Sequence, residues 1–198
     1  MIKALNVTMR LLLLAAVPVL FTQCKKEARQ QEEVQAQTAV TKMKTDKMAK
    51  MYKAYLSPLN NSGVSGMATL MLEGNMLTVT IEASGLTPNQ VHPQHIHGYM
   101  EKNKNAKCPP MSADTDGDGL VELAEGAPFY GPVLLSLTPF PTATAAGNIM
   151  YSNTFTVEKE LLPLQNNAIV LHGMMVNGTY WPTLPVACAQ IMPANGMQ

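Results

Sequence analysis

Short apolar runs separated by glycine and polar turns dominate the chain after residue 60, and their spacing predicts strands. The segments 68–72 and 77–81 are rich in β-formers, and Glu73-Gly74-Asn75-Met76 between them has the glycine and asparagine typical of a tight hairpin turn. In the second segment apolar residues occupy alternate positions. This alternation predicts a strand with one buried face and one solvated face.

Further strands are expected along the rest of the chain. They cover 94–98, 133–137, 148–157, 168–172 and 180–190. About seven strands without a persuasive helix predict an all-β fold, an antiparallel sandwich or barrel. The one helix considered is a short segment with Met43, Met48 and Met51 on one side, and isolated helices of this length are marginal without packing.

The first residues have the layout of a secretion signal. Lys3 and Arg10 come before the apolar run 11–21, and Cys24 follows it. The junction Leu20-Phe21-Thr22-Gln23-Cys24 resembles a bacterial lipobox, although Gln23 is larger than the usual Gly or Ala. We therefore expect a signal peptide over 1–23 and lipidation of Cys24. The alternative is cleavage to a soluble secreted form.

Composition divides the rest of the chain into a polar tether, 24–51, and a β-domain, 52–198. The 198 residues suit one domain with a core, and 46% hydrophobic residues at zero net charge argue against disorder and nucleic-acid binding. The net charge of zero conceals a basic N-terminal region, because residues 24–57 carry eight Lys or Arg and only four acidic residues. Residues 58–198 carry four Lys and ten acidic residues and are therefore acidic.

Attachment to a membrane is expected through the lipid alone, because no apolar run reaches the roughly 18 residues of a spanning helix. This predicts a lipid-anchored protein of the bacterial cell envelope, at the outer membrane, facing either the periplasm or the outside. The sequence indicates no particular protein or matrix partner.

Three of the four histidines lie in His92-Pro93-Gln94-His95-Ile96-His97-Gly98. On a strand, His95 and His97 project from one face and Ile96 from the other, which places two imidazoles side by side. His172, in the apolar run 168–172, is the candidate third ligand, and imidazole suits copper, zinc, nickel or iron. The alternative is that these histidines hydrogen-bond to nearby backbone and hold no metal.

The segment 114–125 satisfies the EF-hand calcium-loop pattern at every specified position. Its expected oxygen ligands come from six residues: Asp114, Asp116, Asp118, Leu120 (by its carbonyl), Glu122 and Glu125. No Lys or Arg occurs within 108–158 to balance the five carboxylates. Nearby prolines forbid long flanking helices, which predicts a structural calcium site rather than a sensor. The alternative is a solvated Asp- and Gly-rich turn.

Two cysteines belong to the β-domain. Cys108 precedes the acidic loop, and Cys188 lies in the expected strand 180–190. If Cys24 carries lipid, these two remain as a pair in an oxidising compartment, and a disulfide between them is expected. The alternative is two separate buried thiols.

Taken together, these motifs resemble two related families over about residues 52 to 192. The His-x-x-His-x-His-Gly run, the later Val-Leu-His and the final Ala-Cys strand are similar to Cu,Zn superoxide dismutases. The opening 62–69 and His95-Ile96-His97-Gly98 look equally like CHRD-type β-domains of bacterial envelope proteins. The resemblance implies a Greek-key β-fold, copper on His95, His97 and His172, a hydrogen-bonding role for His92 and a disulfide between Cys108 and Cys188.

The chain departs from the dismutase pattern at positions that matter for activity. The family has an arginine three residues before the last-strand cysteine, where this chain has Pro185, and no histidine lies between His97 and His172 to bridge copper and zinc. We therefore expect an envelope binding or structural module with a calcium loop and a three-histidine copper site. The alternative is a copper-dependent redox enzyme of superoxide dismutase type.

Overall fold

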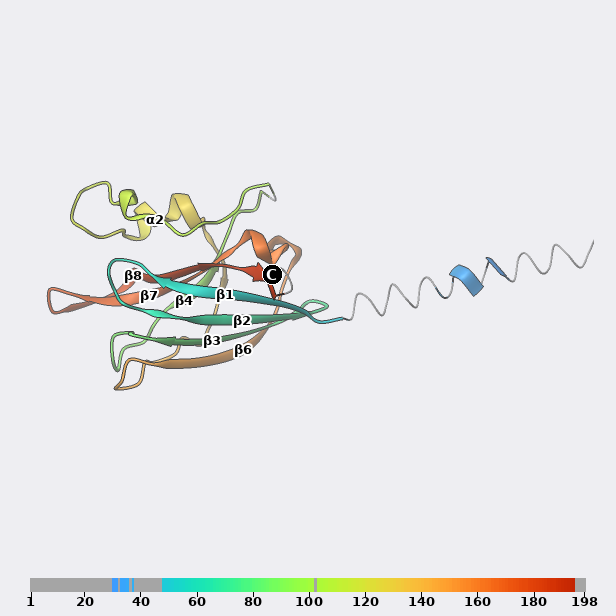
Figure 1. Cartoon of the computed structure of the whole chain (residues 1–198), viewed down its shortest axis with the longest axis horizontal. Helices are drawn as coiled ribbons and strands as arrows, with labels where there is room; N and C mark the ends of the chain where they lie inside the picture. The colour runs from blue at the N-terminus through green and yellow to red at the C-terminus, as the bar shows by residue number, and fades with distance from the viewer. Residues whose placement is uncertain (1–29, 32, 36, 38–47, 102, 195–198) are drawn as a thin grey trace, which may run out of the picture. The chain divides into compact units, whose positions relative to one another are not determined.

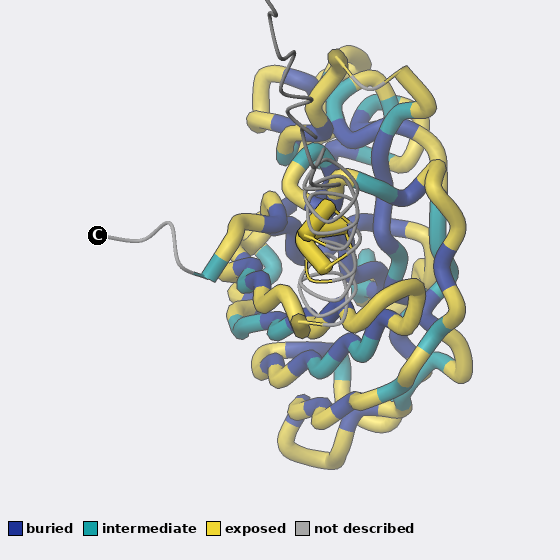
Figure 2. The backbone as a smooth tube through the Cα atoms, turned by 90° about the vertical axis from the view of Figure 1, so that its right-hand side faces the viewer, coloured by how far each residue is buried: buried dark blue, intermediate teal, exposed yellow. Residues whose placement is uncertain are grey.

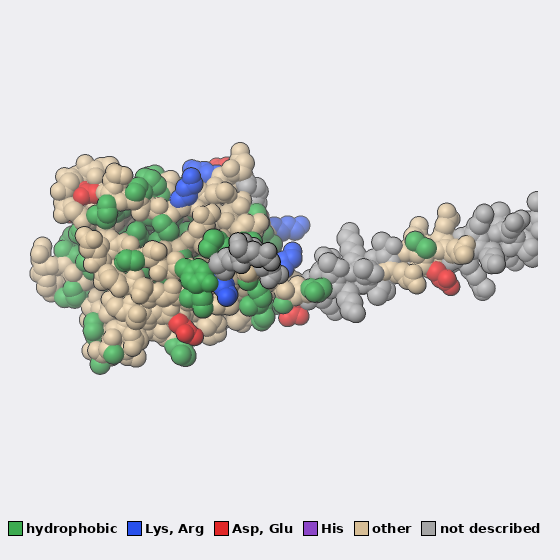
Figure 3. Space-filling view, in the orientation of Figure 1, with side chains coloured by type: hydrophobic (Ala, Val, Ile, Leu, Met, Phe, Trp, Pro, Cys, Tyr) green, Lys and Arg blue, Asp and Glu red, His purple; other side chains and the backbone are tan. Residues whose placement is uncertain are grey.

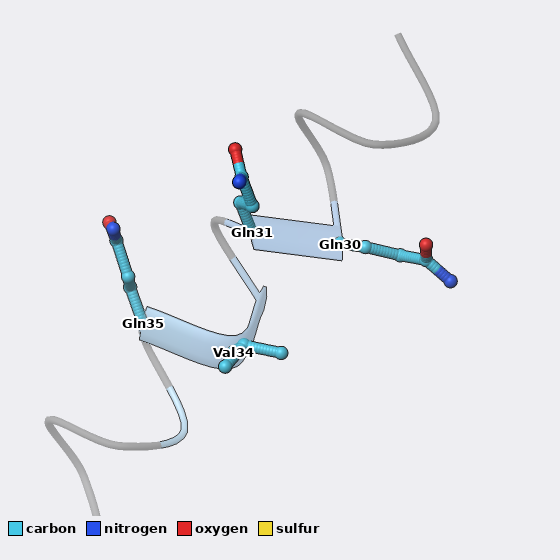
Figure 4. Close-up of a pocket in the computed structure, with 4 residues that line it drawn as sticks. All are labelled: Gln30, Gln31, Val34 and Gln35. Atoms are coloured by element: carbon cyan, nitrogen blue, oxygen red, sulfur yellow. The ribbon is translucent and has the colours of Figure 1, made fainter. Parts of the chain in front are cut away.

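The computed structural model describes residues 30, 31, 33–35, 37, 48–101 and 103–194. The chain separates into two units, Met1–Thr45 and Asp46–Gln198. The described residues of the first unit are helical, and Figure 4 shows Gln30, Gln31, Val34 and Gln35 projecting from the helix. No described helix is long and apolar enough to cross a membrane. The predicted signal peptide and Cys24 lie outside the described residues.

The second unit is built mainly from β-strands (Figure 1). The strands are β1 (Lys50–Pro58), β2 (Ser65–Glu73), β3 (Met76–Ser84), β4 (Gln94–His97), β5 (Val133–Ser136), β6 (Ile149–Thr156), β7 (Ala168–Val176), β8 (Thr179–Gln190) and β9 (Met192–Pro193). The helices are α2 (Leu123–Tyr130) and the short 3-10 turns η1 (Met111–Ala113), η2 (Lys159–Leu161) and η3 (Leu164–Asn166).

The strands pair antiparallel along one path, β5-β4-β7-β8-β1-β2-β3-β6, with β9 beside β1. β1 reaches β8 only through Ser57 and Pro58, so the path divides into two sheets there. β6 pairs with β3 although β4 and β5 come between them in the chain, and β7 returns beside β4 past β5 and β6, which is the Greek-key type of connection. The predicted all-β antiparallel Greek-key fold is confirmed.

The two sheets share one apolar core. In β3 the alternating Leu77, Val79 and Ile81 are buried as predicted, and Thr78 on the opposite face hydrogen-bonds to Thr154 at 2.8 Å. Ile96 of β4 joins the same core from the other sheet. Figure 2 shows buried positions running along the strands while many turns are exposed. The alternate buried side chains of the strands therefore form the core against which the histidine-bearing strand β4 packs.

Many exposed apolar residues of this unit are methionines, including Met51, Met71, Met76 and Met150. Met51 and Met71 are register partners across β1 and β2. On the face drawn in Figure 3, apolar side chains occur in small groups between polar ones. Apolar side chains scattered in this way are normal on a globular surface, so they assign no partner.

Strand β1 is not among the strands that the sequence predicts. It begins with Lys50 and Met51, which are predicted to belong to the tether, and Met51 is also considered for a short helix. The helix prediction is wrong there, because Tyr52, Ala54 and Leu56 bury alternate side chains against the core. Alternation of period two over this stretch is the signal for a strand.

A short helix, α2, follows the acidic loop where no helix is expected. It starts with a capping box, in which the side chains of Glu122 and Glu125 each accept a hydrogen bond from the other residue's backbone N–H. It ends at Gly131, which has a φ of +81°. The nearby prolines limit the length of the helix, but they do not prevent it from forming.

Candidate metal centre

Strand β4 brings two histidines to one side of its sheet. It lies between β5 and β7, and His95, Ile96 and His97 pair with Val170, Ile169 and Ala168 of β7. The ring centroids of His95 and His97 are 5.6 Å apart, whereas Ile96 packs in the core. The predicted side-by-side placement of the two imidazoles is confirmed.

A bulge in β7 aims the third histidine at this pair. The register of β7 on β8 shifts on both sides of His172, next to Gly173. Gly173 has a φ of +107°, and a Cβ atom there would collide with the Tyr180 hydroxyl, so only glycine fits. The His172 ring centroid lies 5.2 Å from that of His95 and 5.9 Å from that of His97.

Two of the rings are held in a defined tautomer by backbone carbonyls. The Nδ1 atom of His97 lies 2.9 Å from the carbonyl oxygen of Gly131, and the Nδ1 atom of His172 lies 2.9 Å from that of Thr183. A carbonyl oxygen only accepts hydrogen bonds, so each Nδ1 carries the proton and donates it. The Nε2 atom of each ring is then left with a bare lone pair, the form that binds a metal.

The remaining nitrogens of the three rings converge. One nitrogen from each of His95, His97 and His172 lies within 4.8 Å of the others. Nδ1 of His95 and Nε2 of His97 and His172 are buried, with no hydrogen-bond partner among the described residues. Buried polar atoms nearly always have partners, so these three call for a ligand. Their donor set fits a metal ion such as copper or zinc.

Burial also keeps the rings uncharged. It lowers the pKa of His97 to about 4 and that of His172 to about 3, despite the opposing effect of the hydrogen bonds to backbone carbonyls. The pKa of His95 is lowered as well, again by burial. All three rings are therefore neutral near pH 7, and only the neutral imidazole binds a metal.

A pocket of about 150 Å³ opens over the histidines. Its wall is apolar, with Pro93 before β4, Leu123 from α2, Val133 from β5, and Pro182 and Thr183 from β8. Deeper in the site, the rings of Tyr130 and His97 contact each other with centroids 4.6 Å apart. The histidines are thus packed on one side and accessible to a small molecule on the other.

His92 lies behind this group rather than in it. Its Nδ1 atom is 2.9 Å from the carbonyl oxygen of His172, and its Nε2 atom is 3.0 Å from that of Thr87. Both ring nitrogens are therefore engaged with backbone, so neither is available to a metal. The resemblance to the dismutases implies a hydrogen-bonding role of this kind for His92.

The acidic loop between β4 and β5 gathers its carboxylates in two groups that share Asp116. Oxygens of Asp114, Asp116 and Asp118 lie within 4.8 Å of one another, and so do oxygens of Asp116, Glu122 and Glu125. The spacing predicted from the sequence thus brings all five side chains together. Calcium itself, and the role of the Leu120 carbonyl, stay predictions.

Crowding within the loop changes how two of its carboxyl groups titrate. Hydrogen bonding to Glu125 raises the pKa of Glu122 to about 7. The Thr115 hydroxyl and backbone N–H both donate to Glu125 at 2.6 Å and lower the pKa of Glu125 to about 2. A bound cation would relieve this crowding, because it favours the ionised form of every carboxylate around it.

Two tethers fix the acidic loop to β8. Cys108 and Cys188 form a disulfide with their Cα atoms 5.7 Å apart, as predicted. The buried Asn60 side chain donates to the carbonyls of Val121 at 3.1 Å and Pro185 at 2.9 Å, and accepts the Val121 N–H at 2.7 Å. Pro185 is the register partner of His172, so the loop is joined to the strand that backs the histidine site.

Several residues of the site cannot be recognised from the sequence pattern. Gly131 and Thr183 act through backbone carbonyls, which leave no trace in side-chain type. Tyr130 and Leu123 reach the site only because α2 folds over it. Asn60 has a weak signal, since Asn60-Asn61 is turn chemistry and both residues take positive φ.

The chain matches no protein-family model and no curated protein. Among solved structures, the Cu(II) form of superoxide dismutase 5 from Candida albicans is similar, with a TM-score of 0.42 and 15% identity, over 76% of this chain and 96% of that one. The resemblance to CHRD-type domains stays a prediction. The case for a metal centre rests on this chain's own side chains.

Proposed function

We propose that this chain is a metal-binding module of the bacterial cell envelope, anchored by lipid on Cys24, which holds one copper ion through His95, His97 and His172. The observation that carries the proposal is the convergence of three buried ring nitrogens that have no other partner. The carbonyls of Gly131 and Thr183 orient two of the rings as donors to a metal. Neutral imidazoles in a pocket closed on one side are a preorganised nitrogen site.

Copper is the metal that this donor set favours. Among the divalent first-row ions, Cu(II) binds a given nitrogen site most tightly. Copper bound there would supply one-electron redox chemistry. Binding is better supported than dismutation, because Pro185 replaces the arginine that the resemblance calls for. Pro185 is buried, uncharged and hydrogen-bonded through its carbonyl to Asn60.

We also propose that the acidic loop takes calcium as a structural ion. The support is the EF-hand spacing of 114–125 and the convergence of its five carboxylates. The disulfide and Asn60 attach both ends of this loop to the β-domain. An ion bound between them would stiffen the wall of the histidine pocket that carries Leu123.

The copper proposal is tested by the loss of one ring nitrogen. His97→Gln removes a ligand, so we expect copper affinity, measured by competition with a chelator, to fall about 100-fold or more. Changes that only disturb the orientation of a ligand already cost about 10- to 100-fold. The wild-type protein should bind one equivalent.

The matched control is Gln94→Leu. Gln94 is buried on the same strand, and neither side-chain polar atom has a partner among the described residues, so its loss costs no hydrogen bond there. This variant should keep wild-type copper affinity. Equal affinity in His97→Gln and the wild type would contradict the proposal.

A further inference from the structure

The mouth of the histidine pocket offers no charge to an incoming ligand. Besides the three histidines, its lining residues are Pro93, Leu123, Val133, Pro182 and Thr183, and the surface that they present is apolar. An ion that enters such a mouth loses its hydration without gaining a partner, whereas an uncharged molecule loses little. The wall itself therefore discriminates by charge.

The sequence around the pocket strengthens this discrimination. All the lining residues belong to 54–101, 108–158 or 160–198, and none of these stretches contains a Lys or Arg. Lys104 and Lys107 line a different pocket, and the Lys104 ammonium lies over the Tyr99 ring, 3.6 Å from its centroid. The charged residue next to Leu123 in sequence is Glu122, of the acidic loop. The lining thus supplies no Lys or Arg side chain that would favour the approach of anions.

The size of the pocket limits the ligand. A volume of about 150 Å³ is enough for a few small molecules or one small ring, since an apolar protein cavity of about that size holds benzene. A larger molecule would have to displace Leu123, the side chain that α2 places at the rim.

We propose that a metal held by His95, His97 and His172 takes small uncharged ligands in its open position, and that Leu123 sets this preference against anions. The inference rests on the proposed copper site. A bound copper ion attracts anions, so the preference for neutral molecules comes from the apolar mouth, whose lining residues include no Lys or Arg. Leu123 is 44% exposed at the start of α2, where an unbranched side chain such as Met or Lys fits without disturbing the core.

The test compares azide, an anion, with imidazole at a pH where imidazole is uncharged, each titrated into the Cu(II)-loaded protein and followed by its visible spectrum. The wild type should bind imidazole more tightly than azide. Leu123→Lys places a positive charge at the rim, so azide affinity should rise about threefold or more, and added salt should reverse the gain. Imidazole affinity should stay within about twofold.

Leu123→Met, which keeps volume without adding charge, should leave both affinities unchanged. Tighter binding of azide than of imidazole to the wild type, or an azide affinity that Leu123→Lys does not change, would overturn the ligand preference. Either result would leave the copper site intact. Failure of the wild type to hold copper would overturn the site and the preference together. The two failures are therefore distinguishable.

Discussion

His97 and His172 show how single backbone contacts determine the chemistry of a side chain. Each ring donates its Nδ1 proton to a carbonyl, from Gly131 and Thr183, and leaves Nε2 bare. The same burial that makes the rings neutral makes protonation costly. In the metal-free protein these residues therefore link stability to pH.

Stability of the metal-free protein should fall in mild acid. The folded-state pKa values of His97 and His172 are about 4 and 3, below the ordinary 6.5, so between these limits the unfolded chain binds more protons. The free energy of unfolding should therefore decrease as pH drops from about 6.5 to about 4, by an amount on the order of 3 kcal/mol from His97. Urea unfolding across this range measures it.

The matched variants isolate this effect from the carboxylates, which titrate in an overlapping range. His97→Gln should lose much of the dependence on pH, whereas Gln94→Leu should keep it. A wild-type unfolding free energy that does not change between pH 6.5 and 4 would contradict the burial argument.

At this scale the sequence predicts residue types well and their environment poorly. His95 and His97 are found because a period of two places them on one face, and His172 because a histidine in an apolar run is unusual. The tautomers depend on carbonyls that arrive from distant loops, and no side-chain pattern encodes a carbonyl. The bulge at Gly173 is equally hidden, because a single glycine in a strand has several interpretations.

Among the elements, the acidic loop and α2 act together as one wall of the site. Glu122 and Glu125 begin the helix, Leu123 lines the pocket, and Gly131 just past the helix holds His97. A change in the loop can therefore alter the position of the histidine ligands through α2.

Removal of calcium should lower the melting temperature of the wild-type protein. Five crowded carboxylates repel one another without a cation, so a chelator should destabilise the fold, and Asp116→Asn should have the same effect in the presence of calcium. Differential scanning calorimetry measures both. The control is Glu73→Gln, which removes an exposed acid at the β2–β3 hairpin, outside the acidic loop. This variant should respond to chelator like the wild type. An unchanged melting temperature after chelation would exclude a structural ion.

The helix itself was within reach of sequence reasoning. Glu122 and Glu125 have the spacing of a capping box, but the same glutamates also satisfy the EF-hand pattern, and the prolines around them favour a loop. The same two glutamates thus fit both a helix cap and a calcium loop. The structure satisfies the capping pattern and, through Asp116, keeps the carboxylates close enough for an ion.

The whole molecule combines an acidic β-domain with a basic N-terminal region. The alternation in β3, together with the other short β-rich runs, predicts a sandwich or barrel, whereas the short contact of β1 with β8 follows from tertiary packing and has no local signal. How the domain is attached to the envelope rests on Cys24, which lies outside the described residues.

Lipid on Cys24 should make the protein partition with membranes. Cys24→Ser removes the acceptor, so the variant should appear in the soluble fraction while its β-domain keeps the Cys108–Cys188 disulfide and its copper affinity. Mass spectrometry of the mature N-terminus gives the direct answer. An unmodified terminus at any other residue would rule out the lipoprotein assignment.

Paramagnetic resonance of the Cu(II)-loaded wild-type protein tests the three-histidine copper site most directly. We expect coupling of the copper to three nitrogens, with one coupling lost in His172→Gln because that variant removes a single ring. A spectrum without nitrogen coupling, or one that His172→Gln leaves unchanged, would contradict a metal centre formed by His95, His97 and His172.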